Sequence, residues 1–540
     1  MQGVRLFEIV RRRPLVLPLA CTLIALVRRS SGWDPPSLWL DDQWLALAVR
    51  YASLDRLYQL RIPSPFGFSV LQKWAAGWAS DREWPLQTIP FLAGLATVPA
   101  TYFVARRVVR RPELAGLACL IAACHPIAEL YATRVKHYSL DVLIALGLWT
   151  LFIGLLQRPS PRRLALLAGG GLIAALFSFA SLFVTAAGLH ALCIDRLVRA
   201  RTVAEPAGAR VRLRRDAIPY CAAAMAFDVA ALVLYHFVLA GQSSAAMQAY
   251  WAKYFLDTGD VASVFSFFVR SALGLPWHAV SPWFLVLLWP VYAGIRGLLR
   301  DPVLRPLVWA AGLVYVAQLT AAVFHVYPMG DPRTSLFAYP VVWILAAAGV
   351  EALLQAAVPR GLQQRALQVA IAVVVLAALC RPRVEYSESR DRQAVEQLLP
   401  RLRESDGMLM LPFGQLALAY YGARPVELRP SIESAHNFEA SPDYPNLFVL
   451  PLEIGGRSVR AHPELAAGPL EQLYAHRYPR LFFLSTHATA ALDRSILEDA
   501  ERHGYHQAQT FQTSGQAALY LLDRMVVARR PAPSAIDARN

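Results

Sequence analysis

Long apolar segments fill the first 380 residues of the chain and limit it to one broad class of fold. Residues 86–104, 139–156 and 218–240 are clear examples. Each approaches the length of about 20 residues that a helix needs to cross a bilayer. Because lipid offers the backbone no hydrogen-bond partners, a spanning segment of this kind must be helical. The sequence therefore predicts a polytopic α-helical membrane protein.

Apolar run lengths predict about eleven spanning helices. Residues 164–195 are also compatible with one long helix, which would change the parity. Arg11–Arg13 precede an apolar stretch as in a signal peptide, but Arg28 and Arg29 follow it in place of a cleavage site, so we expect an uncleaved first span. The expected spans are 14–28, 86–104, 114–130, 139–156, 164–179, 180–195, 218–240, 281–299, 305–323, 334–355 and 366–380.

The net charge of +15 comes almost entirely from arginine. In a membrane protein this excess sets topology, whereas nucleic-acid binding needs a basic patch on a folded face. The arginines lie between apolar runs and do not form such a patch, so we expect no nucleic-acid partner. Alternate loops should be cytoplasmic where they hold Arg11–Arg13, Arg106, Arg107, Arg110, Arg111, Arg158, Arg162, Arg163 and the arginines near 196–217. The loops 29–85, 131–138, 241–280 and 324–333 should face outward.

The six cysteines lie in or beside apolar runs, and no CxxC occurs. We therefore expect free thiols that pack as small core residues, without a disulfide or zinc framework.

Residues 1–380 should form the membrane domain, and residues 381–526 read as a soluble α/β domain. Strands are expected at 407–412 and 480–486, with two more near the end of the domain. The domain lacks a Gly-rich phosphate motif, and with eleven spans it lies outside. Residues 527–540 should be a disordered tail.

The outer loop 29–85 mixes aromatic, apolar and charged residues at helical spacing. This pattern predicts amphipathic helices at about 40–85 that lie on the membrane surface. Asp41 and Asp42 would begin the first of them, where acids also favour the positive end of a helix.

Three outward loops hold ionisable residues that topology does not require, and such residues near lipid are costly to hold. They are Asp41 and Asp42; Arg134, Lys136, His137, Tyr138 and Asp141; and His325, Asp331 and Arg333. Simpler explanations are a solvated helix start for the acid pair, snorkelling for Arg134 and Lys136, and a local partner for His325. Asp141 lies inside an apolar stretch, where burying a carboxylate without a partner would be expensive.

Together these groups fit one reaction. A carboxylate near the outer surface can take a proton from an incoming hydroxyl, and cations nearby can hold a phosphate leaving group. An apolar groove between helices can hold a polyprenyl chain. The chemistry indicated is glycosyl transfer from a lipid-phosphate sugar outside the membrane, where nucleotide sugars are absent.

At these residues the chain resembles the GT-C class of integral-membrane glycosyltransferases, which includes protein O-mannosyltransferases and lipid A aminoarabinose transferases. Asp41–Asp42 are similar to the acidic pair in the first external loop of that class. "RVKHYSLD" resembles a second pattern through Arg134, Tyr138 and Asp141. A late external segment resembles a third pattern through His325, Pro328, Arg333 and Pro340.

The resemblance covers residues 1–380 and implies a polyprenyl-phosphate sugar donor and inversion at the anomeric carbon. It implies Asp41 as the base or as a ligand of Mg²⁺ or Mn²⁺, which only some members need. Asp42 and Asp141 would be secondary acids, and the donor phosphate would be bound by Arg134, Lys136, Tyr138, His325 and Arg333. Lys136 is not demanded by the family pattern. The implied location is a bacterial inner membrane, with the active face toward the periplasm and a role in building the cell envelope.

Two points stay open at the level of sequence. Loop 241–280 contains "QAYWAKYFLDTGD", which fits either a sugar-stacking surface or an interfacial aromatic belt. A transporter or lipid flippase, or a polymerase or ligase that uses polyprenyl carriers, is the alternative function. Sugar and acceptor are not specified, and the acceptor can be a glycan, a lipid or a protein.

Overall fold

The computed structural model describes residues 15–524 apart from 34–36, 80–81, 203–206, 282–283, most of 360–389, and 423, 432–433, 435, 455–456 and 513–516. The chain forms two compact units. The helical unit contains Met1–Asp34, Ala48–Tyr386 and Pro430–Glu439. The α/β unit contains Pro35–Leu47, Ser387–Arg429 and Ala440–Asn540.

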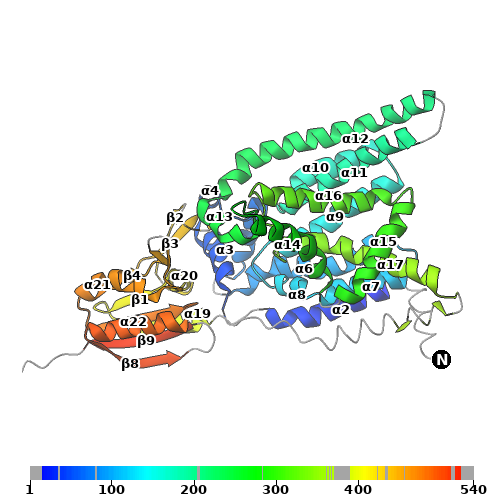
Figure 1. Ribbon diagram of the computed structural model, residues 1–540. Coiled ribbons are helices and arrows are strands. Elements are labelled where there is room, and N and C mark those ends of the chain that lie inside the picture. Colours follow the sequence, from blue (N-terminus) through cyan, green and yellow to red (C-terminus); the bar gives the residue numbers. More distant parts are fainter. Residues whose placement is uncertain are drawn as a thin grey trace, which may run out of the picture. The chain divides into compact units, whose positions relative to one another are not determined.

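The helical unit is built from helices that pack along one another (Figure 1). They are α2 (Val16–Arg29), α4 (Leu54–Gln59), α5 (Phe66–Ala76), α6 (Trp84–Ala105), α7 (Pro112–Cys124), α8 (Pro126–Tyr131), α9 (Tyr138–Gln157), α10 (Pro161–Ala174), α11 (Ala180–Thr202), α12 (Ala207–Leu234), α13 (Ala245–Trp251), α14 (Val261–Val280), α15 (Phe284–Arg300), α16 (Arg305–Val323) and α17 (Tyr339–Ala357).

Among the described residues, six helical segments are long and apolar enough to cross a membrane: Trp84–Ala105, Tyr138–Gln157, Ala180–Arg201, Arg215–Gln242, Arg305–Val323 and Leu336–Ala356. The other described segments that we expected to span are helical but shorter: α2 and α10 have 14 residues, α7 has 13 and α15 has 17. Residues 164–195 form two helices, because the chain turns between α10 and α11. The segment 366–380 and the tail 527–540 fall largely or wholly outside the described residues.

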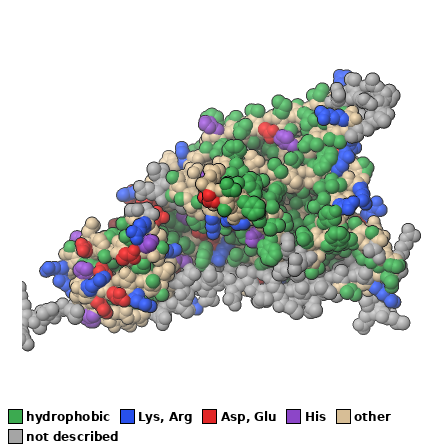
Figure 2. Space-filling view, in the orientation of Figure 1, with side chains coloured by type: hydrophobic (Ala, Val, Ile, Leu, Met, Phe, Trp, Pro, Cys, Tyr) green, Lys and Arg blue, Asp and Glu red, His purple; other side chains and the backbone are tan. Residues whose placement is uncertain are grey.

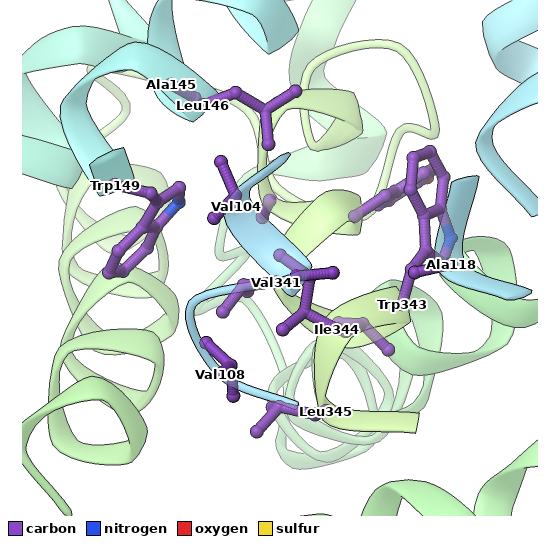
Figure 3. Close-up of a cluster of buried hydrophobic side chains, with 14 of the residues drawn as sticks. Val104, Val108, Ala118, Ala145, Leu146, Trp149, Val341, Trp343, Ile344 and Leu345 are labelled. Carbon is purple, nitrogen blue, oxygen red and sulfur yellow. The ribbon is translucent and has the colours of Figure 1, made fainter. Parts of the chain in front are cut away.

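The core of the helical unit lies where α6, α7, α9 and α17 meet. Figure 3 shows part of this apolar cluster, with Val104 between Trp149 on one side and Trp343, next to Ala118, on the other. Small residues bring other helices closer still. A Cβ atom on Gly349 would lie 1.6 Å from the Pro290 carbonyl oxygen, so α15 and α17 can pack backbone to backbone only with glycine there.

The surface of the helical unit is strongly apolar. Figure 2 shows hydrophobic side chains spread over the visible face of this unit, whereas the α/β unit displays mixed charges. Helix α12 alone exposes Ile218, Met225, Val229, Leu232 and Val233. Exposed apolar area on this scale marks a surface that meets lipid rather than water.

The arginine-rich loops gather at one end of the helical unit. Arg107 donates to the Thr150 carbonyl at 2.8 Å, and Arg163 donates to the Gly154 carbonyl at 2.8 Å. Arg305 pairs with Asp195 at 2.7 Å. These bonds join the ends of α6, α9, α10, α11 and α16, so loops far apart in sequence share one side, as the charge pattern requires.

The expectation of free cysteines is wrong for one pair. Cys193 on α11 and Cys221 on α12 form a disulfide across neighbouring helices, with Cα atoms 5.2 Å apart. The two positions are 28 residues apart on two different helices, so sequence spacing carried no signal of their contact. Cys21, Cys119 and Cys124 are free and buried, as we expected for small core residues.

A five-stranded mixed sheet organises the α/β unit, in the order β4-β1-β7-β9-β8. β4 (Leu447–Val449), β1 (Gly407–Met410) and β7 (Arg480–Thr486) are parallel, while β9 (Ala517–Arg524) and β8 (Tyr505–Gln512) are antiparallel additions. Short strands β2 (Val426–Pro430) and β3 (Phe438–Pro442) pair with each other, as do β5 (Glu453–Ile454) and β6 (Arg457–Ser458). The helices are α19 (Asp391–Leu398), α20 (Pro412–Tyr421), α21 (Ala467–Ala475) and α22 (Ala490–Arg502).

Strands β1 and β7 are buried along nearly their whole length, and Leu409, Phe483 and Ile496 help to form one of the two apolar clusters of this unit. Central parallel strands read as continuous apolar runs because both faces are covered. Helix α3 (Leu40–Tyr51) begins in this unit, since residues 35–47 group with the α/β unit and not with the helical unit.

Candidate functional site

The first part of the site is the amino-terminal end of α9. Tyr138 opens the helix and Asp141 lies in its first turn, both buried. His137 precedes the helix, with its Nε2 atom 3.6 Å from an Asp141 carboxylate oxygen. Burial, helped by the charge of Lys136, lowers the pKa of His137 to about 3, so the imidazole is neutral. The carboxyl group of Asp141 therefore lies beside a neutral ring and not beside a cation.

The second part is Arg333, in the loop between α16 and α17. Gly330 turns the chain with a φ of 91°, and the Asp331 carboxylate accepts hydrogen bonds from the Arg333 backbone N–H at 2.9 Å and from its Nε at 3.2 Å. The Asx geometry of Asp331 and the fixed φ of Pro332 set this loop locally. Asp331 and Pro332 therefore fix the orientation of the Arg333 side chain.

Aromatic residues from a distant loop complete the surroundings of Arg333. Its Nη2 donates to the Tyr250 hydroxyl at 3.1 Å, and its guanidinium carbon lies 4.5 Å from the Trp251 ring centroid. Burial lowers the pKa of Arg333, but the nearby Tyr138, Asp331, Tyr131 and Tyr250 together raise it above its ordinary value, so the group is a permanent cation. We call Arg333, Asp331, Tyr250 and Trp251 the Arg333 cluster.

A cavity of about 270 Å³ lies beside the Arg333 cluster. Its lining is mainly apolar and aromatic, and it includes Tyr138, Phe183, Trp251 and Tyr327. The Tyr327 hydroxyl donates to the Thr334 carbonyl at 3.1 Å, which holds the wall against the Arg333 loop. A cavity with an apolar lining and one fixed cation at its side suits an amphiphilic ligand with an anionic head.

Arg134, Lys136 and His325 are the other residues predicted to bind the donor phosphate. The first two lie just before α9, and His325 lies just after α16. Arg134 and Lys136 are half-buried in the loop before α9, and their contact with a donor stays a prediction. His325 has a left-handed backbone with φ of 58°, stacks on Phe255 with ring centroids 5.0 Å apart, and bonds the Leu256 carbonyl through Nε2 at 2.9 Å. His325 therefore fastens the loop after α13 to the end of α16.

The acid pair lies in the other unit. Asp41 and Asp42 occupy the first turn of α3, with Asp42 buried and Asp41 half-buried. They begin a helix, as the sequence pattern predicts. Their meeting with Arg333 in one cavity stays a prediction, because residues 35–47 belong to the α/β unit.

The sequence did not predict that Tyr250 and Trp251 contact Arg333. The motif "QAYWAKYFLDTGD" suggested sugar stacking or a membrane belt, and both stay predictions; in the structure Tyr250 accepts a hydrogen bond from Arg333, 83 residues further along. Tyr254 belongs to the same segment: burial and the nearby Asp331 raise its pKa to about 12, so its hydroxyl stays protonated. The available signal was the excess of aromatic residues in loop 241–280, which favours cation–π partners without naming them.

Few of the predicted site residues could act as ligands of a divalent ion. Mg²⁺ is commonly held by one or two carboxylates together with phosphate oxygens and water, and Asp41 and Asp42 supply carboxylates of this kind. Within the described part of the chain, no three side chains of His, Cys, Asp or Glu converge as a metal site. The steps proposed below use no divalent ion.

No family model and no curated protein matches this chain. The solved structures that are similar to it include two of ArnT from Cupriavidus metallidurans. The structure in the apo state is 12% identical over 93% of this chain and 97% of that one, with a TM-score of 0.49. The structure bound to undecaprenyl phosphate is also 12% identical, over 95% of this chain and 99% of that one, with a TM-score of 0.49.

ArnT is a lipid A aminoarabinose transferase of the GT-C class, so these neighbours come from the group that the sequence motifs resemble. A TM-score of 0.49 and 12% identity do not carry a reaction from one chain to another.

Proposed function

We propose that this chain is a membrane glycosyltransferase that moves a sugar from a polyprenyl-phosphate donor to a hydroxyl acceptor. The observation that carries the proposal is the Arg333 cluster beside an apolar cavity. A polyprenyl phosphate has an anionic head and a long apolar tail, and the two features complement the permanent cation and the aromatic lining. A charge-assisted contact of guanidinium with phosphate is among the strongest hydrogen bonds available to a protein.

The proposed chemistry is a single displacement. The acceptor hydroxyl oxygen forms a bond to the anomeric carbon while the bond from that carbon to the phosphate oxygen breaks. Asp41 takes the hydroxyl proton, and the polyprenyl phosphate leaves with the bonding electron pair. Arg333 offsets the charge that develops on the phosphate. Attack opposite the leaving group inverts the anomeric carbon, and no strong general acid is needed because phosphate leaves as a stable anion.

Asp42 and Asp141 are proposed to serve the acceptor side. Asp141 is held at the start of α9, next to Tyr138 on the cavity wall. A carboxylate in that place can accept a hydrogen bond from an acceptor or donor hydroxyl group. Arg134, Lys136 and His325 are proposed as further contacts of the donor phosphate.

The location proposed for the reaction is the outer face of a bacterial inner membrane. Supporting this, the arginine-rich loops join the opposite ends of the same helices from those that carry Tyr138 and Arg333. Arginine-rich loops stay cytoplasmic, which leaves the Arg333 cluster on the periplasmic side. The same placement disfavours a transporter, whose polar residues should lie at mid-membrane on broken helices.

The proposal is tested with purified chain in proteoliposomes and a panel of radiolabelled polyprenyl-phosphate sugars, with an envelope extract as the source of acceptors. We expect label to leave one donor and appear in an acceptor. Asp41→Asn should fold and lose this transfer, while Asp55→Asn, a matched change at an exposed acid of α4, should retain it. Transfer by Asp41→Asn at the normal rate, or the absence of transfer from every donor, would contradict the proposal.

A further inference from the structure

The segment that carries the acid pair is bound to the α/β unit at three places. Residues 35–47 group with this unit although nearly 350 residues separate them from it in sequence. Gln43, one residue after the acid pair, is fully buried, as is Asp391 at the start of α19. The Gln43 amide nitrogen donates to an Asp391 carboxylate oxygen at 2.8 Å.

The bond from Gln43 to Asp391 also organises the start of α3. The same amide nitrogen donates to the Leu38 carbonyl at 2.9 Å, so both of its N–H groups have acceptors. These two acceptors fix which way the amide points, since its oxygen would be repelled by the carboxylate. Burying an unpaired amide is costly, so the segment favours the position in which the Asp391 carboxylate accepts from Gln43.

The second contact is made by the carboxyl end of α20. The Leu38 backbone N–H donates to the Tyr421 hydroxyl at 2.7 Å, and that hydroxyl donates to the Ser37 hydroxyl at 3.3 Å. The guanidinium of Arg392 lies 5.3 Å from the Tyr421 ring centroid and braces it. The backbone directly before the acid pair is therefore tied to the α/β unit.

The third contact is made by His487, directly after β7. Its backbone is left-handed, with a φ of 55°, which is costly for a residue other than glycine. Its ring meets Trp39 edge to face at 5.5 Å, and its Nε2 atom lies 3.6 Å from Asp391. Arg460 donates to the His487 carbonyl oxygen. This strained backbone places the His487 ring against Trp39, which lies two residues before Asp41.

We infer that the α/β unit positions the acid pair, with Asp391 and His487 as positioning residues that act through Gln43 and Trp39. The inference rests on the proposed function, in which Asp41 takes the proton of the acceptor. Three contacts from α19, α20 and the end of β7 leave the first turn of α3 little freedom. An error of about 1 Å in placing a catalytic group can cost about 100-fold in rate.

The test uses the full chain and compares Asp391→Ala and Gln43→Leu with Asp443→Ala, a matched change at an exposed acid of the same unit. Hydrogen exchange of residues 37–47 should speed up in the first two variants and not in the third. The value of kcat should fall about 10- to 100-fold while KM for the donor stays unchanged. Asp391→Asn keeps an oxygen that accepts from Gln43 and should restore both the exchange pattern and kcat.

Two results would overturn the inference: unchanged exchange of residues 37–47 in both Asp391→Ala and Gln43→Leu, or faster exchange with unchanged kcat. Asp391→Ala and Gln43→Leu remove the same bond, so their double variant should be no slower than the slower single variant. A wild-type chain that transfers no sugar would instead overturn the proposed function. The exchange of residues 37–47 would then still decide whether Asp391 holds this segment.

Discussion

Removal of the Arg333 guanidinium should weaken use of the donor more than any other single change in the helical unit. Arg333→Met keeps most of the apolar stem and removes the charge, the bond to Tyr250 and the contact with the Trp251 ring. A hydrogen bond to a charged group contributes about 1.5–3 kcal/mol. At about 1.4 kcal/mol for each factor of ten, loss of one such bond to phosphate lowers kcat/KM about 10- to 150-fold.

The assay is donor titration in proteoliposomes with labelled polyprenyl-phosphate sugar. Arg333→Lys should fall between wild type and Arg333→Met, because an ammonium keeps the charge but cannot bond phosphate and Tyr250 through a planar fork. Arg270→Met is the matched control, since Arg270 is exposed on α14 and bonds only its own helix at the Ser266 carbonyl among the contacts described. Folding of each variant is checked by its melting temperature.

One result would refute the reasoning about Arg333. If Arg333→Met folds and its kcat/KM stays within about threefold of wild type, the guanidinium does not meet the donor phosphate. That loss corresponds to less than about 0.7 kcal/mol, which is below the value of any charge-assisted bond to a phosphate.

Three further changes test other parts of the account. Asp141→Asn keeps the shape of a buried side chain and removes its carboxyl group, so transfer should fall at least about tenfold; an unchanged rate in a folded protein would exclude a role for that group. Trp251→Leu removes a cation–π contact of about 0.5–2 kcal/mol, so KM for the donor should rise about 2- to 30-fold, whereas Trp251→Phe should change it less. Burial raises the pKa of Asp493, so its stabilising effect is complete below the ordinary carboxyl pKa and is lost as pH rises through its folded pKa. Asp493→Asn should therefore reduce the fall in melting temperature between pH 4 and pH 7, and an unchanged fall would show that another group causes it.

The sequence predicts the long spanning helices well, because apolar length is a direct physical requirement of the bilayer. Helices α6, α9, α11, α12, α16 and α17 lie where the apolar runs lie. The lengths of the shorter helices α2, α7, α10 and α15 were harder to predict, because hydropathy does not report where a helix ends. Pro126, for example, ends one apolar helix and begins the next, so a run that reads as one segment is divided between α7 and α8.

The candidate site was predictable only in parts. Tyr138, Asp141 and Arg333 could be identified because ionisable residues at the ends of apolar helices need a reason to be there. The contact of Arg333 with Tyr250 and the contact of Gln43 with Asp391 join residues 83 and 348 positions apart. No local pattern encodes such pairs, because they follow from the way whole helices and a second unit pack. The disulfide of Cys193 and Cys221 was missed for the same reason.

The most direct test of the central claim is a single-particle structure of the full chain with polyprenyl phosphate bound. The account predicts that the phosphate group lies within hydrogen-bond distance of the Arg333 guanidinium, with the prenyl chain entering the cavity lined by Tyr138 and Trp251. It also predicts the Asp41 carboxylate beside the phosphate, on the same side of the membrane. A phosphate bound away from Arg333, or Asp41 on the opposite side of the membrane, would contradict the proposed sugar transfer.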